Sequence, residues 1–338
     1  MEQGSPRGGA EEWRVDWRSG QPHRRSAMGA AYRGDGRGER GIALVLVLWI
    51  LSLLAIIANS FVFSTRTDTL LTANLVGLAR AEALADAGVQ RAIYALLKPS
   101  VDPARWQGDG RMHVWEYAGE RISITIRNES AKIDINTANP ELMKGLLRNA
   151  GVVDGHALES LLDAIQDWRD ADDLRRPNGA EKEDYIAAGK TYIPANSSFQ
   201  TLEELRQVLG MTDPVYRRIV GLITVYSGQS GINSSSASRE VLLAIPGVDP
   251  AAVDAYIALR NVPPGQIIPI FPPAQAFSAG DGNVFSIVSD VKLSDNSRFI
   301  REAVVRVEQK PNQPATFLAW RSPPARLVTP PPPPNENM

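Results

Sequence analysis

The chain has 338 residues, 43% of them hydrophobic and 22% charged, and it contains no cysteine. This length exceeds what one compact core usually holds, so we expect two globular parts with additional tails. The formal net charge of -2 excludes a general attraction to nucleic acid or to an anionic membrane surface, and the lack of cysteine excludes disulfides and thiolate metal sites.

The first forty residues are rich in glycine and arginine and contain almost no aliphatic side chains, which predicts a segment without stable structure. Translation from Met28 instead of Met1 would omit most of it. The stretch Gly36–Gly41 matches the dinucleotide-binding pattern G-x-G-x-x-G. No strand precedes it and an apolar helix follows, so the sequence does not predict a nucleotide site here.

An uncharged apolar segment runs from Gly41 to Thr65, and its first eighteen residues contain only one polar residue, Ser52. About 20 apolar residues in a helix cross the ~30 Å hydrocarbon layer, whereas the apolar part of a secretory signal needs only about 7–15. No small-x-small cleavage motif follows closely, and the arginine-rich flank disfavours a buried core helix. We therefore predict a membrane-spanning helix over 42–64, with the arginine-rich side in the cytoplasm.

A stripe of apolar residues continues after this span. Its members recur at three-four spacing, which places them on one helical face: Leu71, Leu75, Leu78, Ala81, Ala85, Val89, Ala92 and Leu96. Pro99 ends the pattern. The sequence predicts one continuous helix, whose second part at 65–99 divides its contacts between a sheet of the same chain and helices of partner proteins.

The following sequence predicts strands on either side of a helical region. Alternating apolar residues indicate strands within His113–Ile135, with a polar turn near Asn128–Ser130. A second strand region spans Val284–Glu308 with a turn at Asp295–Ser297, and Thr316–Trp320 adds an edge strand. The helices expected between the two regions are Glu141–Leu147, His156–Trp168, Leu202–Leu209, Pro214–Tyr226, Ser238–Ala244 and Ala251–Leu259.

These patterns predict an α+β fold in which a long N-terminal transmembrane and amphipathic helix packs on a small antiparallel sheet. A large all-helical insertion with helix-hairpin-helix-like units interrupts this sheet. The expected boundaries are 100–136 for the first part of the sheet, 137–261 for the insertion, 262–322 for the second part of the sheet, and 323–338 for a proline-rich disordered tail.

Two related phrases in the insertion resemble helix-hairpin-helix units. Ile135-Asn136-Thr137-Ala138 and Ile232-Asn233-Ser234 each precede an apolar helix, and the second continues to Ile245-Pro246-Gly247-Val248. Such hairpins often bind DNA phosphates through backbone N–H groups, so a membrane-anchored DNA-binding protein is the alternative function. Asp249 replaces the second hairpin glycine, and acids outnumber Arg239 and Arg260 around it, which favours a structural role without nucleic acid.

An acidic stretch in the insertion is the candidate metal site. Oxygen ligands gather around a loop with Pro177 and Gly179, and the candidate ligands are Asp167, Asp170, Asp172, Asp173, Glu183 and Asp184, with Asn178 and Glu181 in the same run. Calcium takes about 6–8 oxygens in irregular geometry. The alternative is that Arg169, Arg175 and Arg176 neutralise these carboxylates and leave an ordinary solvated helix end.

Catalytic patterns are not found in the sequence. Its three histidines, His23, His113 and His156, lie in unlike contexts, and no G-x-S-x-G, H-E-x-x-H or P-loop motif occurs. A calcium-dependent hydrolase is a weak further alternative. We expect the protein not to be an enzyme.

The start of the apolar helix resembles a type IV prepilin-type signal, because Arg40-Gly41 is followed directly by Ile42-Ala43-Leu44-Val45-Leu46. Most members of that family carry glutamate at the fifth position of the mature protein, where this chain has Leu46. The departure and the helical insertion resemble the K-type minor pseudopilins of type II secretion systems. This resemblance covers nearly everything from Gly41 to about Trp320.

The resemblance implies that prepilin peptidase removes a cytoplasmic leader, 1–41, by cutting between Gly41 and Ile42, and that Ile42 is then N-methylated. It also implies a pilin-like fold, a single-pass protein of the bacterial inner membrane with a periplasmic C-terminal domain, and a structural calcium ion at the acidic stretch. The implied partners are the I- and J-type minor pseudopilins and the pseudopilus. The expected interaction residues of the helix are Leu46, Leu71, Leu75, Leu78, Val89 and Leu96. The implied function is to initiate the pseudopilus at its tip for export of folded proteins across the outer membrane.

Overall fold

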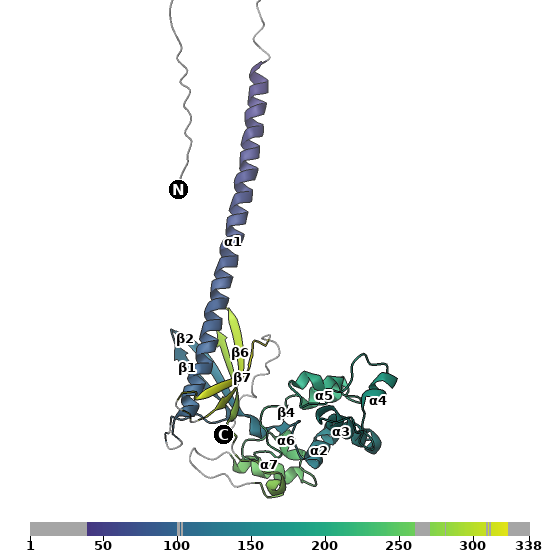
Figure 1. Cartoon of the computed structure of the whole chain (residues 1–338). Helices are drawn as coiled ribbons and strands as arrows, with labels where there is room; N and C mark the ends of the chain where they lie inside the picture. The colour runs from purple at the N-terminus through teal and green to yellow at the C-terminus, as the bar shows by residue number, and fades with distance from the viewer. Residues whose placement is uncertain are drawn as a thin grey trace, which may run out of the picture. The chain divides into compact units, whose positions relative to one another are not determined.

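The computed structural model describes residues 39–99, 102, 104–260, 271–280, 282–308, 310 and 312–323 (Figure 1). Residues 1–38 of the expected leader and the expected tail from residue 324 onward lie outside the described residues. The chain divides into two units, Met1–Thr67 and Asp68–Met338.

The first unit contains the start of helix α1, which spans Glu39–Leu97. The helix thus begins three residues before the predicted start at Ile42. Every side chain described in this unit is exposed, including Trp49 at 73% and Phe61 at 71%. The apolar window of the helix has a mean hydropathy of 2.5 and no buried residue, so by length and composition it is compatible with a single membrane span.

The second unit contains a five-stranded antiparallel sheet in the order β1-β2-β5-β6-β7. The strands are β1 (Asp109–Tyr117), β2 (Glu120–Asn128), β5 (Val284–Lys292), β6 (Arg298–Val307) and β7 (Ala315–Arg321). Because β2 pairs directly with β5, the chain between them is an insertion into the sheet. This confirms the predicted combination of a long helix and an interrupted antiparallel sheet.

The C-terminal part of α1 packs on this sheet (Figure 1). The contact is made by one face of the helix, as the stripe predicts, with Ala81, Leu84, Ala85, Val89, Ala92, Ile93 and Leu96 all buried. They meet Ile122, Ile124 and Ile126 of β2 and apolar residues of β5 and β6. Gly88 permits the close approach, since a Cβ there would lie 2.2 Å from Oγ of Ser289.

Two strand turns differ in how well the sequence predicts them. Asn296, with a φ of +67°, lies in the predicted turn between β5 and β6. The turn between β1 and β2 is formed by Ala118 and Gly119, with φ of +52° and +79°. This turn was not predicted from the sequence, because alanine does not usually mark a left-handed turn position.

The insertion contains the short helices α2 (Pro140–Asn149), α3 (Gly155–Arg169), α4 (Lys182–Ala187), α5 (Asp213–Ile219), α6 (Arg239–Leu243) and α7 (Pro250–Leu259). The 3-10 helices are η1 (Glu129–Ala131), η2 (Leu202–Gln207) and η3 (Pro272–Phe277). Side chains of Asn139, Asp154 and Ser238 cap α2, α3 and α6 by accepting backbone N–H bonds.

The insertion differs from the prediction in two respects. It is not all-helical, because β3 (Ile133–Asp134) and β4 (Ile223–Thr224) form a two-stranded parallel sheet. For the same reason the predicted helix Pro214–Tyr226 ends at Ile219, and the following residues extend to pair with β3. The pairing brings Ile133 and Ile223 into one apolar core. The same core includes residues of α2, α3 and α6.

Candidate metal centre

The acidic stretch folds back onto the end of α3. Asp167 lies in the last turn of that helix and is fully buried, and Asp170 is its C-cap residue. Gly179 passes so close that a Cβ there would lie 1.9 Å from Oδ2 of Asp167. Only glycine therefore lets the loop backbone approach this carboxylate.

Two of the predicted ligands share one arginine. Nη1 of Arg176 donates to Oδ1 of Asp167 at 2.8 Å and also donates to Oδ2 of Asp170. The backbone N–H of Ala180 donates to Oδ2 of Asp167 at 2.9 Å. Burial raises the pKa of the Asp167 carboxyl, while the hydrogen bonds from Arg176 and Ala180 act in the opposite direction. These contacts agree with the alternative considered from the sequence, in which arginine side chains neutralise the carboxylates of the acidic stretch.

Glu181 is not neutralised in this way. The residue is 2% exposed, and among the residues that the structure describes neither of its carboxylate oxygens has a hydrogen-bond partner. Burial, followed by the charges of Asp167 and Asp170, raises the pKa of Glu181 to about 7. A buried, unpaired carboxylate costs free energy unless it is protonated or a cation neutralises it.

The acidic loop and the segment that follows it contain further oxygen atoms of the kind that a hard cation binds. Within the described part of the chain, Oδ1 of Asp170 and Oδ1 of Asn196 are also buried without a partner, and Nδ2 of Asn196 donates to Asp173 at 2.6 Å. A set made only of oxygen atoms suits calcium and not the metals that prefer nitrogen or sulfur. Across the described residues, no group of three His, Asp or Glu side chains converges as a bound ion requires. Ion binding therefore requires Arg176 to release its carboxylates.

The remaining predicted ligands make local contacts. Asp172 accepts a bond from the N–H of Leu174 at 2.9 Å. Asp184 accepts one from the N–H of Glu181 at 3.0 Å and pairs with Arg175 at 3.4 Å. Glu183 is exposed on α4, unlike the buried residues Asp167 and Glu181.

The sequence contains no signal that singles out Glu181. Glu181 is four residues before Tyr185, which is fully buried, but Glu183 is three residues before Ile186, which is 57% exposed. Spacing along α4 therefore pairs each acid with an apolar residue. Only the burial of Tyr185 and the exposure of Ile186 in the folded chain distinguish the two acids.

The predicted interaction residues of α1 divide into two groups. Leu71, Leu75 and Leu78 are 57%, 59% and 45% exposed, whereas Val89 and Leu96 belong to the core formed with the sheet. Leu46 is 60% exposed in the first unit. Gly41 and Ile42 lie in the first turns of α1, which places the predicted cleavage bond inside the helix as described.

The basic residues of the second hairpin are both occupied within the insertion. Nε of Arg239 donates to Asp254 at 2.6 Å, and Nη1 of Arg260 donates to the carbonyl oxygens of Ser234 and Ala237 at 2.8 and 2.7 Å. These contacts hold both guanidinium groups against atoms of the insertion. They do not position either group to bind a DNA phosphate.

Comparison with known proteins gives a consistent set of relatives. Residues 124–228 match a family described as type II secretion system (T2SS), protein K. The type II secretion system protein K of Klebsiella pneumoniae is 30% identical over 232 residues, which cover 61% of this chain and 69% of that protein. The protein K of Pseudomonas aeruginosa is 23% identical over 304 residues, covering 80% and 90%.

A solved structure has a similar fold. It is the crystal structure of the GspK-GspI-GspJ complex from the type 2 secretion system of enterotoxigenic Escherichia coli. One chain matches with a TM-score of 0.54 and 16% identity, over 77% of this chain and 99% of that one. The similarity shows that the two chains share a fold.

Proposed function

This chain belongs to the type II secretion system protein K family of minor pseudopilins, and from that premise we propose that it initiates pseudopilus assembly from the tip. Protein K is a structural component of the secretion system. The proposed role is to help export folded proteins across the outer membrane, with no enzymatic step.

The observation that carries the proposal is an exposed apolar face on α1 within the second unit. Leu71, Leu75 and Leu78 share one face of the helix by three-four spacing and are 57%, 59% and 45% exposed, shortly before the buried apolar residues that begin at Ala81. Exposed apolar side chains clustered on a helix indicate a binding surface. A neighbouring pseudopilin helix would bury these residues by ordinary helix packing.

The proposed partners are I- and J-type minor pseudopilins. The related K protein of enterotoxigenic E. coli was solved in a complex with GspI and GspJ, and we extend those partner types to this chain. Leu46 supports a place at the tip. A glutamate at this position would need a neighbouring amine within the membrane, and a subunit with leucine does not require one.

Membrane insertion and processing form part of the same proposal. The chain is anchored in the inner membrane by α1, and the arginine-rich N-terminal side stays in the cytoplasm. Prepilin peptidase cuts between Gly41 and Ile42, and Ile42 is methylated. Calcium binds the acidic loop through Glu181 with Asp167, Asp170, Asp172 and Asp173, and its role is structural.

Co-purification tests the proposed assembly. The full-length chain, co-expressed with I- and J-type pseudopilins and extracted in mild detergent, should form a stable complex that contains all three. Recovery of the chain alone would contradict the assembly role. Tight, salt-sensitive binding of duplex DNA that is lost on changing Arg239 would support the DNA-binding alternative instead.

A further inference from the structure

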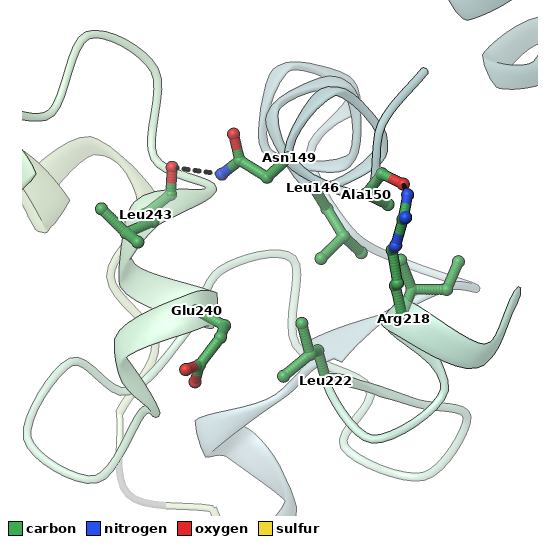
Figure 2. Close-up of a pocket in the computed structure, with 8 residues that line it drawn as sticks. Leu146, Asn149, Ala150, Arg218, Leu222, Glu240 and Leu243 are labelled. Atoms are coloured by element: carbon green, nitrogen blue, oxygen red, sulfur yellow. Dashed lines mark hydrogen bonds between the residues drawn. The ribbon is translucent and has the colours of Figure 1, made fainter. Parts of the chain in front are cut away.

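A pocket of about 300 Å³ opens in the insertion where α2, α5 and α6 meet (Figure 2). None of its lining residues belongs to the acidic loop. Leu146 and Ile219 contribute buried side chains to its wall, whereas Leu222 and Leu243 are only partly buried. The core of the insertion is therefore incompletely covered at this point.

Backbone contacts fix the walls of the pocket. A Cβ at Gly145 of α2 would lie 2.0 Å from the carbonyl oxygen of Ala244, so α2 and the end of α6 touch through their main chains. Nδ2 of Asn149 donates to the carbonyl oxygen of Leu243 at 2.8 Å (Figure 2). Nη1 of Arg218 donates to that of Ala150 at 2.6 Å. These bonds tie the three elements together, so the pocket is preformed.

The interior of the pocket selects an apolar group. Its inner wall is aliphatic. Of the three polar side chains that line it, Asn149 and Arg218 already donate to carbonyl oxygens and Glu240 lies at the rim. Small-molecule sites span about 300–1,000 Å³ and contain convergent polar groups. This pocket lies at the lower end of that range and its charged groups lie at the rim, so a single large aliphatic or aromatic side chain suits the interior better than a cofactor.

The rim of the pocket carries two opposite charges. Glu240 and Arg218 lie on opposite sides of it in Figure 2. Glu240 is exposed in the first turn of α6 and forms no hydrogen bond or ion pair with the described residues. Arg218 uses Nη1 for Ala150, and a guanidinium has five N–H donors in all.

We propose that this pocket is a docking site for a segment of a partner protein. One large apolar side chain of the segment enters the pocket, a neighbouring basic residue faces Glu240, and an acidic residue on the other side faces Arg218. The charge complementarity favours a peptide over a neutral apolar molecule, which would leave both rim charges unused. The site is independent of the α1 surface on which the proposed function rests.

Fluorescence anisotropy of labelled peptides tests this site. The full-length chain in lipid nanodiscs is titrated with two short peptides that differ only in the order Lys-Leu-Asp or Asp-Leu-Lys. We expect saturable binding of one order, at least tenfold weaker binding when Leu is replaced by Ser, and a loss of about two- to fivefold in Glu240→Lys, as for an exposed ion pair. Replacing the peptide lysine with glutamate should restore binding to this variant.

Glu203→Lys is the matched control, because Glu203 is an exposed carboxylate of η2 outside the pocket, and it should bind like the unchanged chain. Equal binding of the Leu and Ser peptides, or no saturable binding, would overturn the proposal. So would a Glu240→Lys effect that the charge-swapped peptide does not reverse. Self-association of the chain that disappears in Glu240→Lys would assign the pocket to a second copy instead.

Discussion

Arg301 of β6 donates from Nε to Oδ1 of Asp86 in α1 at 2.6 Å, across 215 positions of sequence. Nη2 of the same guanidinium donates to Glu82, one turn earlier in the helix, at 2.7 Å. The Arg301 side chain is 7% exposed and lies over the ring of Trp320 at 4.9 Å. A buried arginine thus adds a directional polar link to the apolar contact between α1 and the sheet.

Replacement of this arginine by methionine should destabilise the second unit. Arg301→Met keeps an apolar stem but removes the charge-assisted hydrogen bonds to Asp86, Glu82 and Ser322, so we expect a loss of about 1–3 kcal/mol in the free energy of unfolding. Arg298→Met is the control, because Arg298 pairs with Asp290 at 2.6 Å on the more exposed part of β6. It should cost about 1 kcal/mol or less. Equal effects in thermal or denaturant unfolding would contradict the structural role of Arg301.

Processing should occur between Gly41 and Ile42, because the charged residues end and the apolar helix begins at this bond. N-terminal sequencing of the protein from cells with prepilin peptidase should read Ile42 first. Gly41→Val should remain uncut, and Gly38→Val, outside the bond, should be cut normally. A mature protein that still begins at Met1 or Met28, or efficient cutting of Gly41→Val, would contradict the prepilin assignment.

Charged substitutions on the exposed face of α1 should abolish assembly without unfolding the chain. In the double variant Leu71→Asp/Leu75→Asp, assembly would bury two unpaired carboxylates against a partner helix. The free-energy cost of burying these charges strongly disfavours the complex. Both leucines are exposed in the isolated chain, so its melting temperature should hardly change. Thr72→Asp, at an exposed polar position of the same stretch, serves as the control. Full co-purification of the double variant with I- and J-type pseudopilins would refute this helical interface.

Calcium should stabilise the chain, because it binds the folded acidic loop and not the unfolded chain. At a hundredfold excess over Kd the expected gain is about 2.7 kcal/mol, and magnesium should substitute poorly because it demands octahedral geometry. The melting temperature should depend less on calcium in the variants Asp170→Asn and Asp172→Asn. The largest reduction is expected in Glu181→Gln. Glu183→Gln should leave it unchanged, since Glu183 is exposed outside the cluster.

Arg176 provides an independent test of the same site. Because Arg176 and the ion compete for Asp167 and Asp170, Arg176→Met should lower stability in chelator and enlarge the gain on adding calcium. Chelator-stripped protein that melts at one temperature from micromolar to millimolar calcium would leave the arginine-neutralised loop as the correct description.

The chain without calcium should lose stability as pH rises from about 4.5 to about 7. The native pKa of Glu181 is raised to about 7 from an ordinary value of 4.5. The folded state therefore binds more protons than the unfolded state within this window, and the free energy of unfolding falls as pH increases. The expected change is on the order of 1–3 kcal/mol, measured by denaturant unfolding at each pH.

Glu181→Gln separates this effect from other titrating groups, because it should remove this part of the pH slope. Calcium coordination needs the deprotonated carboxylate, so the stabilisation by calcium should increase over the same pH range. A pH profile that is the same in Glu181→Gln and in the unchanged chain would show that Glu181 is not the group responsible.

Elements whose signals are local could be predicted before the fold was known. Uninterrupted apolar character predicted the helix after Gly41, and three-four spacing predicted the buried positions Val89 and Leu96. Period-two alternation predicted β2 through Ile122, Ile124 and Ile126. These patterns can be read because each depends on residues a few positions apart that share one face.

Features made by residues distant in sequence depend on how the chain packs and could not be predicted in this way. The pairing of β3 with β4 ended a helix that the sequence had extended to Tyr226, because the extended backbone gains hydrogen bonds from a strand about ninety residues away. The acidic loop was visible in the sequence as a cluster of carboxylates. Which of them has no hydrogen-bond partner among the described residues, Glu181, depends on how Arg176 and Gly179 fold against α3. Burial and hydrogen-bond pairing are properties of the packed chain, so composition alone could not distinguish a neutralised carboxylate from an unpaired one.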